Sequence, residues 1–358
     1  MMVTRFFAGL TGGPALVLIE GTFADVWSAE STVTYYVFLT MASFIGAAAG
    51  PVVGGFITEE KWRWSVGWIP LLVNIAALLL AVGMPETYPR EILRARARRQ
   101  GKSIQLAPAQ SGVTFAQMAT HTLINPVKML VAEPIVVLLS LYVGFLFAVI
   151  FQFFILIPVV LSMTYKFQRY QVGLAFTSAI GGALLAALIV VIMDLPSSAT
   201  RPRHGRNPEL EYRLRPGMLG GILVTGSLFW IAWTADPKIN HVVPIAGTAI
   251  FITGSVMVLT SAISYIFDAY PAPGTLAALT AAACFRIAMA GMLPLLVIKM
   301  VMALTGAWAV STFGFIGAAL MAVPWVLYYF GGRLRMRSKY NMGTMNMVMA
   351  HDGKDEEM

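Results

Sequence analysis

The chain carries a succession of apolar segments long enough to cross a membrane, and this feature constrains its fold more than any other. A spanning helix needs about 20 mostly apolar residues, because lipid offers its backbone no hydrogen-bond partners. Of the 358 residues, 58% are hydrophobic and 12% are charged, whereas about 25% are charged in soluble domains. We therefore predict an all-α integral membrane protein. Its nine expected transmembrane helices cover residues 3–26, 32–57, 65–84, 134–163, 172–193, 217–235, 242–267, 275–298 and 300–331.

The 25 Lys and Arg residues gather in alternate connections between these segments. Residues 85–133, residues 194–216 and the part after 332 hold most of them, and such an excess is typical of cytoplasmic loops. This distribution accounts for the net charge of +8 and disfavours a nucleic-acid partner. It also predicts a cytoplasmic C-terminus.

The basic loops divide the chain unequally. Residues 1–84 form a partial N-terminal bundle of three spans, and residues 85–133 form a cytoplasmic linker with an arginine-rich interfacial helix. Residues 134–332 form a bundle of six spans, and residues 333–358 form a cytoplasmic tail. Three spans before the linker and six after it are the count expected when one three-helix repeat of a twelve-span transporter is absent.

Enzymatic chemistry has little support in the sequence. The four histidines lie in loops or at the edges of spans, without the spacing of metal ligands. The tripeptide GKS at 101–103 lacks the upstream glycine of a phosphate-binding loop, and the one cysteine cannot form an internal disulfide. We expect no enzymatic activity, no cofactor and no metal site.

Residues 43–57 read SFIGAAAGPVVGGFI, which places a proline and a run of glycines inside an apolar helix. Gly46, Gly50 and Gly54 are four residues apart and so share one helix face, and Gly55 follows directly. Pro51 removes a backbone hydrogen-bond donor from the helix. The glycines alone are explained by close packing against another helix. A hinge between two helical bundles is the functional alternative.

The stretch GAAAGPVVGGF, with WRW shortly after it, resembles the antiporter signature of fungal drug:proton antiporters of the twelve-spanning branch of the major facilitator superfamily. RFFAGLTGGPALVLIEGTFADVW is similar to the fourth helix of that family, with Arg5 as its motif arginine and Asp25 as its terminal aspartate. MPETYPREIL, SAISYIFDAYP and AACFRIAMAGMLPL are similar to later family segments. The resemblance implies an incomplete fold in which the nine spans match family helices four to twelve.

The resemblance further implies a proton-coupled secondary transporter that exports small organic molecules, such as drugs, toxins or secondary metabolites, by alternating access. Its partners would be a small-molecule substrate, protons and the lipid bilayer, and its expected location is the plasma membrane. Two alternatives stay open. The chain could be a non-transporting truncated membrane protein, or it could transport polyamines or another metabolite with the same fold.

Charged groups inside spans are costly and are therefore candidates for function. Arg5 and Glu20 lie about 60° apart around the first span, so both could face one cavity. In this apolar helix Glu20 could exchange a proton or bind a cation, or it could be an interfacial carboxylate before Asp25. Arg5 could instead be an arginine that reaches the membrane edge.

Two further polar residues lie deep in later spans. Arg286 could contact a substrate, or it could stabilise a gate by pairing with Asp268 or with a helix C-terminus. Gln152 lies beside Phe151, Phe153 and Phe154 and could help to form an aromatic substrate site, although such phenylalanine runs often face lipid. The expected proton or substrate path therefore comprises Arg5, Glu20, Asp25, Gln152 and Arg286.

Overall fold

The structure is a computed structural model, and all of the regular structure in its described part is helical. The described residues are 32–57, 63–83, 85–87, 89–100, 124–199, 210–270, 274–304, 306–336 and 338, with the single positions 6, 7, 9, 12, 13, 19 and 22.

Seven apolar stretches within these residues are helical and long enough to cross a membrane. Four are formed mainly by one helix each, and three are formed by two consecutive helices. The single helices are α2 (Thr32–Gly55), α7 (Pro134–Thr164), α10 (Arg215–Thr234) and α11 (Val242–Ala269). The pairs are α8 (Arg169–Ala175) with α9 (Thr177–Ala199), α12 (Gly274–Met292) with α13 (Pro294–Leu304), and α14 (Gly306–Leu320) with α15 (Ala322–Met336).

These seven stretches correspond to seven of the nine predicted spans. The predicted span 3–26 lies almost wholly outside the described residues, so the count of nine stays a prediction. The predicted boundary near residue 300 is wrong, because α13 continues to Leu304 and the last span begins at Gly306. The apolar run has no strongly polar turn at that point, so hydropathy alone could not locate the break.

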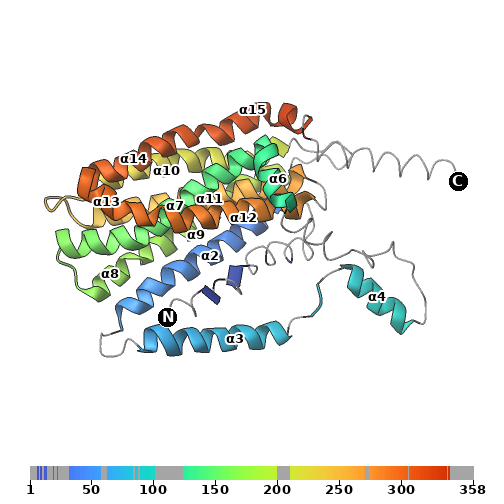
Figure 1. Ribbon diagram of the computed structural model, residues 1–358, viewed down its shortest axis with the longest axis horizontal. Helices are drawn as coiled ribbons and strands as arrows, with labels where there is room; N and C mark the ends of the chain where they lie inside the picture. Colours follow the sequence, from blue (N-terminus) through green and yellow to red (C-terminus); the bar gives the residue numbers. More distant parts are fainter. Residues whose placement is uncertain are drawn as a thin grey trace.

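The shorter helices lie around the main bundle. The predicted span 65–84 is a π-helical turn, η3 (Trp64–Trp68), followed by α3 (Ile69–Gly83), which has no buried residue. The predicted linker, residues 85–133, contains the arginine-rich helix α4 (Pro89–Arg99) and also α6 (Asn125–Ala132), which packs on α12. In Figure 1, α3 and α4 lie apart from the bundle formed by α2 and α7 to α15.

Small residues bring the bundle helices close together. A Cβ added at Gly220 of α10 would lie 2.7 Å from the carbonyl oxygen of Gly254 on α11, and one added at Gly182 of α9 would lie 2.3 Å from that of Ala249. Helices in lipid depend on such packing, because burial of apolar surface from lipid gains little. One continuous core joins α2 to the helices from α7 onward. The helix α2 therefore packs on the six-span bundle, along α8, α9 and α11.

Candidate functional site

A cavity of about 250 Å³ lies between α2 and the six-span bundle. Its walls come from α2, α7, α11 and α12, with Ile19 from the N-terminal segment. Its lining is mostly apolar and includes four aromatic rings, those of Phe44, Phe147, Phe151 and Phe154. A smaller apolar cavity of about 30 Å³ shares Phe44 and Phe154 and continues toward Phe176 at the start of α9. The arrangement can enclose an apolar organic molecule of modest size.

Arg286 brings a positive charge to this cavity. Its side chain comes from α12, is only 5% exposed and lines the cavity wall. The guanidinium carbon lies 4.7 Å from the centre of the Phe147 ring on α7, within the range of a cation–π contact. The sequence predicted that Arg286 lies deep in a span and left its role open between substrate contact and gate pairing, and the structure places it against the aromatic wall.

The hydroxyl groups of Thr40 and Ser43, both on α2, also line the cavity. Thr40 and Thr260, from α2 and α11, have their hydroxyl oxygens 2.8 Å apart, and Thr40 also donates to the carbonyl oxygen of Tyr36 at 2.8 Å. Ser43 donates to the carbonyl oxygen of Leu39 at 3.1 Å. Sequence reasoning missed both residues, because a single Thr or Ser in an apolar helix commonly bonds its own backbone, as both do here.

The other predicted path residues are not brought together with Arg286. Gln152 is 2% exposed and buried on α7, but it is absent from the lining of the cavity, although its neighbours Phe151 and Phe154 take part. Arg5, Glu20 and Asp25 fall outside the described residues, so their roles stay predictions.

The antiporter-like stretch forms the last turns of α2. The helix remains regular through Pro51 and ends at Gly55. A Cβ added at Gly55 would lie 2.9 Å from Gly173 Cα on α8, and one added at Gly173 would lie 2.8 Å from the Pro51 carbonyl oxygen.

The three glycines of the predicted packing face, unlike Gly55, have no close neighbour among the described atoms. A Cβ added at Gly46, Gly50 or Gly54 meets no described atom within 4 Å. The close approach in the described structure is therefore made by Gly55 and the backbone of Pro51, one residue beyond the expected ladder.

A polar contact joins α2 to the bundle at the opposite end of the helix. Thr34 donates to Asp194 Oδ2 of α9 at 2.7 Å, and Tyr36 lies against Phe267 of α11 with ring centres 5.9 Å apart. Hence α2 contacts the six-span bundle near both of its ends and at Thr40 in between.

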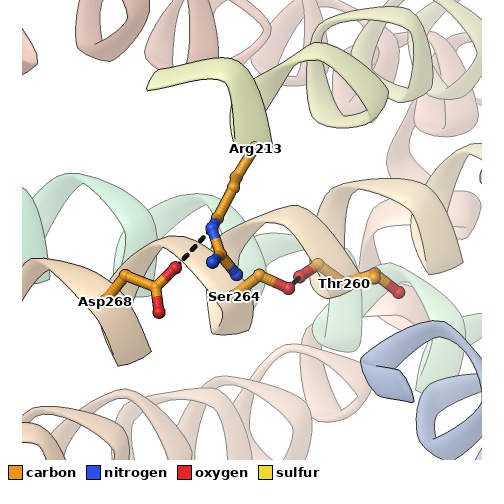
Figure 2. A network of polar contacts seen from close by, with 4 residues as sticks. All are labelled: Arg213, Thr260, Ser264 and Asp268. Atoms are coloured by element: carbon orange, nitrogen blue, oxygen red, sulfur yellow. Dashed lines mark hydrogen bonds and ion pairs between the residues drawn. The ribbon is translucent and has the colours of Figure 1, made fainter. Parts of the chain in front are cut away.

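Charged side chains form a network at one end of the six-span bundle. The short 3-10 helix η5 (Leu210–Leu214) carries Arg213, which forms an ion pair with Asp268 of α11 (Figure 2). In the same view Ser264 donates to the Thr260 carbonyl oxygen, at 2.7 Å. Asp268 was one of the partners that the sequence left open for Arg286, and the ion pair shown for it is with Arg213.

The neighbouring Glu211 of η5 forms a second ion pair, with Arg335 of α15. Both pairs are formed by side chains that are 13 to 16% exposed. Together they join η5, in the predicted cytoplasmic loop 194–216, to α11 and to α15. Spacing in the sequence offers no signal for pairs between residues so far apart in the chain.

A buried carboxylate lies where the linker enters α7. Glu133 is 3% exposed, and Tyr270, just after α11, donates its hydroxyl to Glu133 Oε2 at 3.2 Å. Burial, reinforced by the charge of Glu133, raises the pKa of Tyr270, so the phenol keeps its proton and remains a donor. In the described part of the chain, no group of His, Cys, Asp and Glu side chains could hold a metal ion.

The sequence is similar to a known protein family and to several of its members. The family model described as Major Facilitator Superfamily matches residues 1–290. A citrinin biosynthesis cluster transporter of Monascus ruber is 28% identical over 95% of this chain and 70% of its own length. Efflux pump FUBT of Fusarium oxysporum is 29% identical over 97% of this chain and 60% of its own length.

Two more relatives extend the comparison. Polyamine transporter 4 of Saccharomyces cerevisiae is 28% identical over 98% of this chain and 57% of its own length, and the transporter phm3 of Pyrenochaetopsis is 33% identical over 93% and 70%. The chain thus spans roughly 57 to 71% of the length of these relatives and others like them. No solved structure matches it significantly. The apolar helices, the cavity between α2 and the six-span bundle, and the family match over most of the chain agree that it belongs to the Major Facilitator Superfamily.

Proposed function

We propose that this protein is a proton-coupled secondary transporter that exports small organic molecules by alternating access. The observation that carries the proposal is the position of α2. This helix, with its antiporter-like signature, closes one wall of a cavity whose other helical walls belong to the six-span bundle. Movement of α2 against that bundle would open the cavity to one side of the membrane or the other.

The contacts of α2 are suited to such a movement. The hydrogen bond from Thr34 to Asp194 lies at one end of the helix, and the approach of Gly55 to Gly173 lies at the other. A rocking motion separates one end while the other stays closed, so each contact would seal one face of the membrane in turn. The contact between the Thr40 and Thr260 hydroxyls lies between them, beside the cavity.

Export of organic molecules is favoured by the cavity and by the names of several relatives. Efflux pump FUBT and the Monascus ruber transporter of a citrinin biosynthesis cluster are named for export or for metabolite biosynthesis. Polyamine transporter 4 suggests polyamine transport as a second candidate.

Proton coupling and orientation belong to the proposal as well. Glu20 is the carboxylate of the first span that would exchange protons, and Arg5 and Asp25 would belong to the same proton or substrate path. The arginine-rich α4 and the basic loop 194–216 would face the cytoplasm, which places the C-terminus on that side. The expected membrane is the plasma membrane.

Accumulation of a fluorescent efflux substrate in cells that express the chain tests the proposal. A working exporter lowers accumulation relative to an empty vector, and a protonophore removes the difference. Glu20→Gln should weaken the dependence on the pH gradient, whereas Glu59→Gln, in a predicted loop, should leave it unchanged. Equal accumulation with and without a stably inserted chain would favour the alternative of a non-transporting membrane protein.

A further inference from the structure

The linker helix α6 has one buried face and one exposed apolar face. Ile124 at its N-cap, Val127 and Val131 are 46, 62 and 81% exposed. These three side chains are spaced three and four residues apart, so they share a face about 60° wide. Pro126 and Met129, on the opposite face, are buried, and α6 packs on α12. The helix is thus held on the bundle by one face and presents aliphatic side chains on the other.

The position of α6 indicates what meets this exposed face. The helix ends at Ala132, Glu133 has an extended backbone, and the spanning helix α7 begins at Pro134. With 31 residues, α7 is about 46 Å long, close to the thickness of about 40 to 45 Å of a bilayer with its headgroup regions. The start of α7, and α6 beside it, therefore lie at the level of the lipid headgroups.

Charge at this end of the bundle favours a lipid surface. Lys128 is exposed and lies beside the apolar face, one residue after Val127. Interfacial helices insert apolar side chains at the boundary between headgroups and acyl chains, while their basic side chains meet anionic headgroups. Arg333 and Arg335, in the last turn of α15, lie at the same end of the bundle (Figure 1). Basic residues gather on the cytoplasmic side of membranes, where anionic lipids are also found.

The helix α6 is joined to helices that line the large cavity. Glu133, its C-cap residue, accepts a hydrogen bond from Tyr270 after α11, and Thr275 of α12 donates to the Tyr270 carbonyl oxygen. Both α11 and α12 contribute to the cavity wall. In the first turn of α12, Leu276 is 53% exposed, so apolar exposure continues from α6 onto a spanning helix. A displacement of α6 would therefore be transmitted to helices around the cavity.

We propose that α6 docks on the bilayer surface on the predicted cytoplasmic side. Ile124, Val127 and Val131 insert at the boundary between headgroups and acyl chains, and Lys128 contacts an anionic phospholipid headgroup. This docking goes beyond the proposed function, since it holds whether or not the chain exports. A protein partner or a second copy of the chain fits less well, because a stable protein interface takes about 20 to 30 residues a side and α6 has eight.

Fluorescence quenching in lipid nanodiscs tests the docking. The full chain carries Cys284→Ala and one new cysteine labelled with bimane. The test position is Val131→Cys, Leu188→Cys is the lipid-exposed reference on α9, and Lys238→Cys is the water-exposed reference between α10 and α11. Brominated phosphatidylcholine quenches from the lipid and acrylamide quenches from the water. We expect brominated lipid to quench at Val131 nearly as strongly as at Leu188, and acrylamide to quench several-fold less than at Lys238.

Anionic lipid tests the contact assigned to Lys128. Adding phosphatidylserine to the nanodisc should lower acrylamide quenching at Val131→Cys further, and Lys128→Gln should remove that response. Lys238→Gln removes the same charge far from α6 along the chain and should leave the response intact. Val127→Cys lies on the same face as Val131 and should behave as Val131→Cys does. Size-exclusion chromatography identifies any variant that fails to fold.

Each contrary outcome has one meaning. Strong quenching by acrylamide with none by brominated lipid, at both Val127 and Val131, would overturn the docking. Shielding from both quenchers that arises only when a nanodisc holds two chains would assign the face to a second copy and overturn it as well. A phosphatidylserine response that survives Lys128→Gln would overturn the headgroup contact. Intact lipid contact in a chain that does not export would contradict the proposed function alone.

Discussion

Replacement of Gly55 by alanine should destabilise the protein, although alanine is the better helix former. The new methyl would lie 2.9 Å from both the Arg169 carbonyl oxygen and Gly173 Cα, whereas ordinary carbon contacts begin at about 3.5 Å. Both obstructing atoms are backbone atoms of α8, so the clash cannot be relieved by a change of side-chain rotamer. The helices α2 and α8 must separate to admit the methyl group.

The expected size follows from this geometry. Overpacking of this kind costs about 1 to 3 kcal/mol. At Gly50 the same substitution meets no described atom within 4 Å, and alanine in a helix interior is favoured over glycine by up to about 1 kcal/mol. Gly55→Ala and Gly50→Ala should therefore have effects of opposite sign or, at least, of clearly different size.

Thermal unfolding of the purified variants, followed by size-exclusion chromatography, measures the difference. We expect Gly55→Ala to lower Tm by about 1 to 4 °C and Gly50→Ala to leave it unchanged or slightly raised. Gly173→Ala should resemble Gly55→Ala, because its methyl would lie 2.8 Å from the Pro51 carbonyl oxygen. The effects of the two should not add, since each already separates the same helices. Equal Tm values for Gly55→Ala and Gly50→Ala would refute the reasoning.

Three further substitutions probe the polar contacts. Asp268→Asn should cost about 1 to 3 kcal/mol, because it leaves Arg213 largely buried without its opposite charge, and Tm should fall by several degrees. Tyr270→Phe should lower the free energy of unfolding by about 1 to 3 kcal/mol, because it removes a hydrogen-bond donor from buried Glu133. This loss should be constant below about pH 9, where an unperturbed tyrosine also keeps its proton. Thr40→Val should cost about 1 kcal/mol in a chemical unfolding assay and should change the rate of any export, because the lost hydroxyl contact joins α2 to α11. An unchanged Tm in the first two, or an unchanged unfolding midpoint in the third, would contradict the corresponding contact.

Hydropathy predicted the spanning helices better than it predicted their orientation about their axes. The predicted ranges 134–163 and 242–267 lie within one to two residues of the ends of α7 and α11, because a long apolar run between polar loops has few alternatives in lipid. In such helices every face is apolar, so the pattern does not indicate which face meets the bundle. The packing face of Gly46, Gly50 and Gly54 stays a prediction, and the close approach seen among the described residues is made by Gly55.

In the candidate site, too, the sequence indicated some residues and could not indicate others. Arg286 was predicted because a charge deep in an apolar span is conspicuous, and it lies in the cavity wall. Gln152 was predicted from its aromatic neighbours, yet it is not among the residues that line the cavity with Phe151 and Phe154. The pairing of Glu133 with Tyr270 depends on the packing of segments 137 residues apart, which no local pattern contains.

The buried arginine also bears on the order in which the protein is made. An arginine near the centre of a spanning helix costs about 2.5 to 3.5 kcal/mol during insertion. The span Gly274–Val301 has a mean hydropathy of 2.0, which helps to offset that cost. The adjacent Phe285 packs on α7 so closely that a Cβ at Gly144 would lie 2.8 Å from its ring. Because α7 is synthesised earlier, it is already in the bilayer to receive α12, and biosynthesis from the N-terminus delivers Arg286 to a prepared surface instead of to bare lipid.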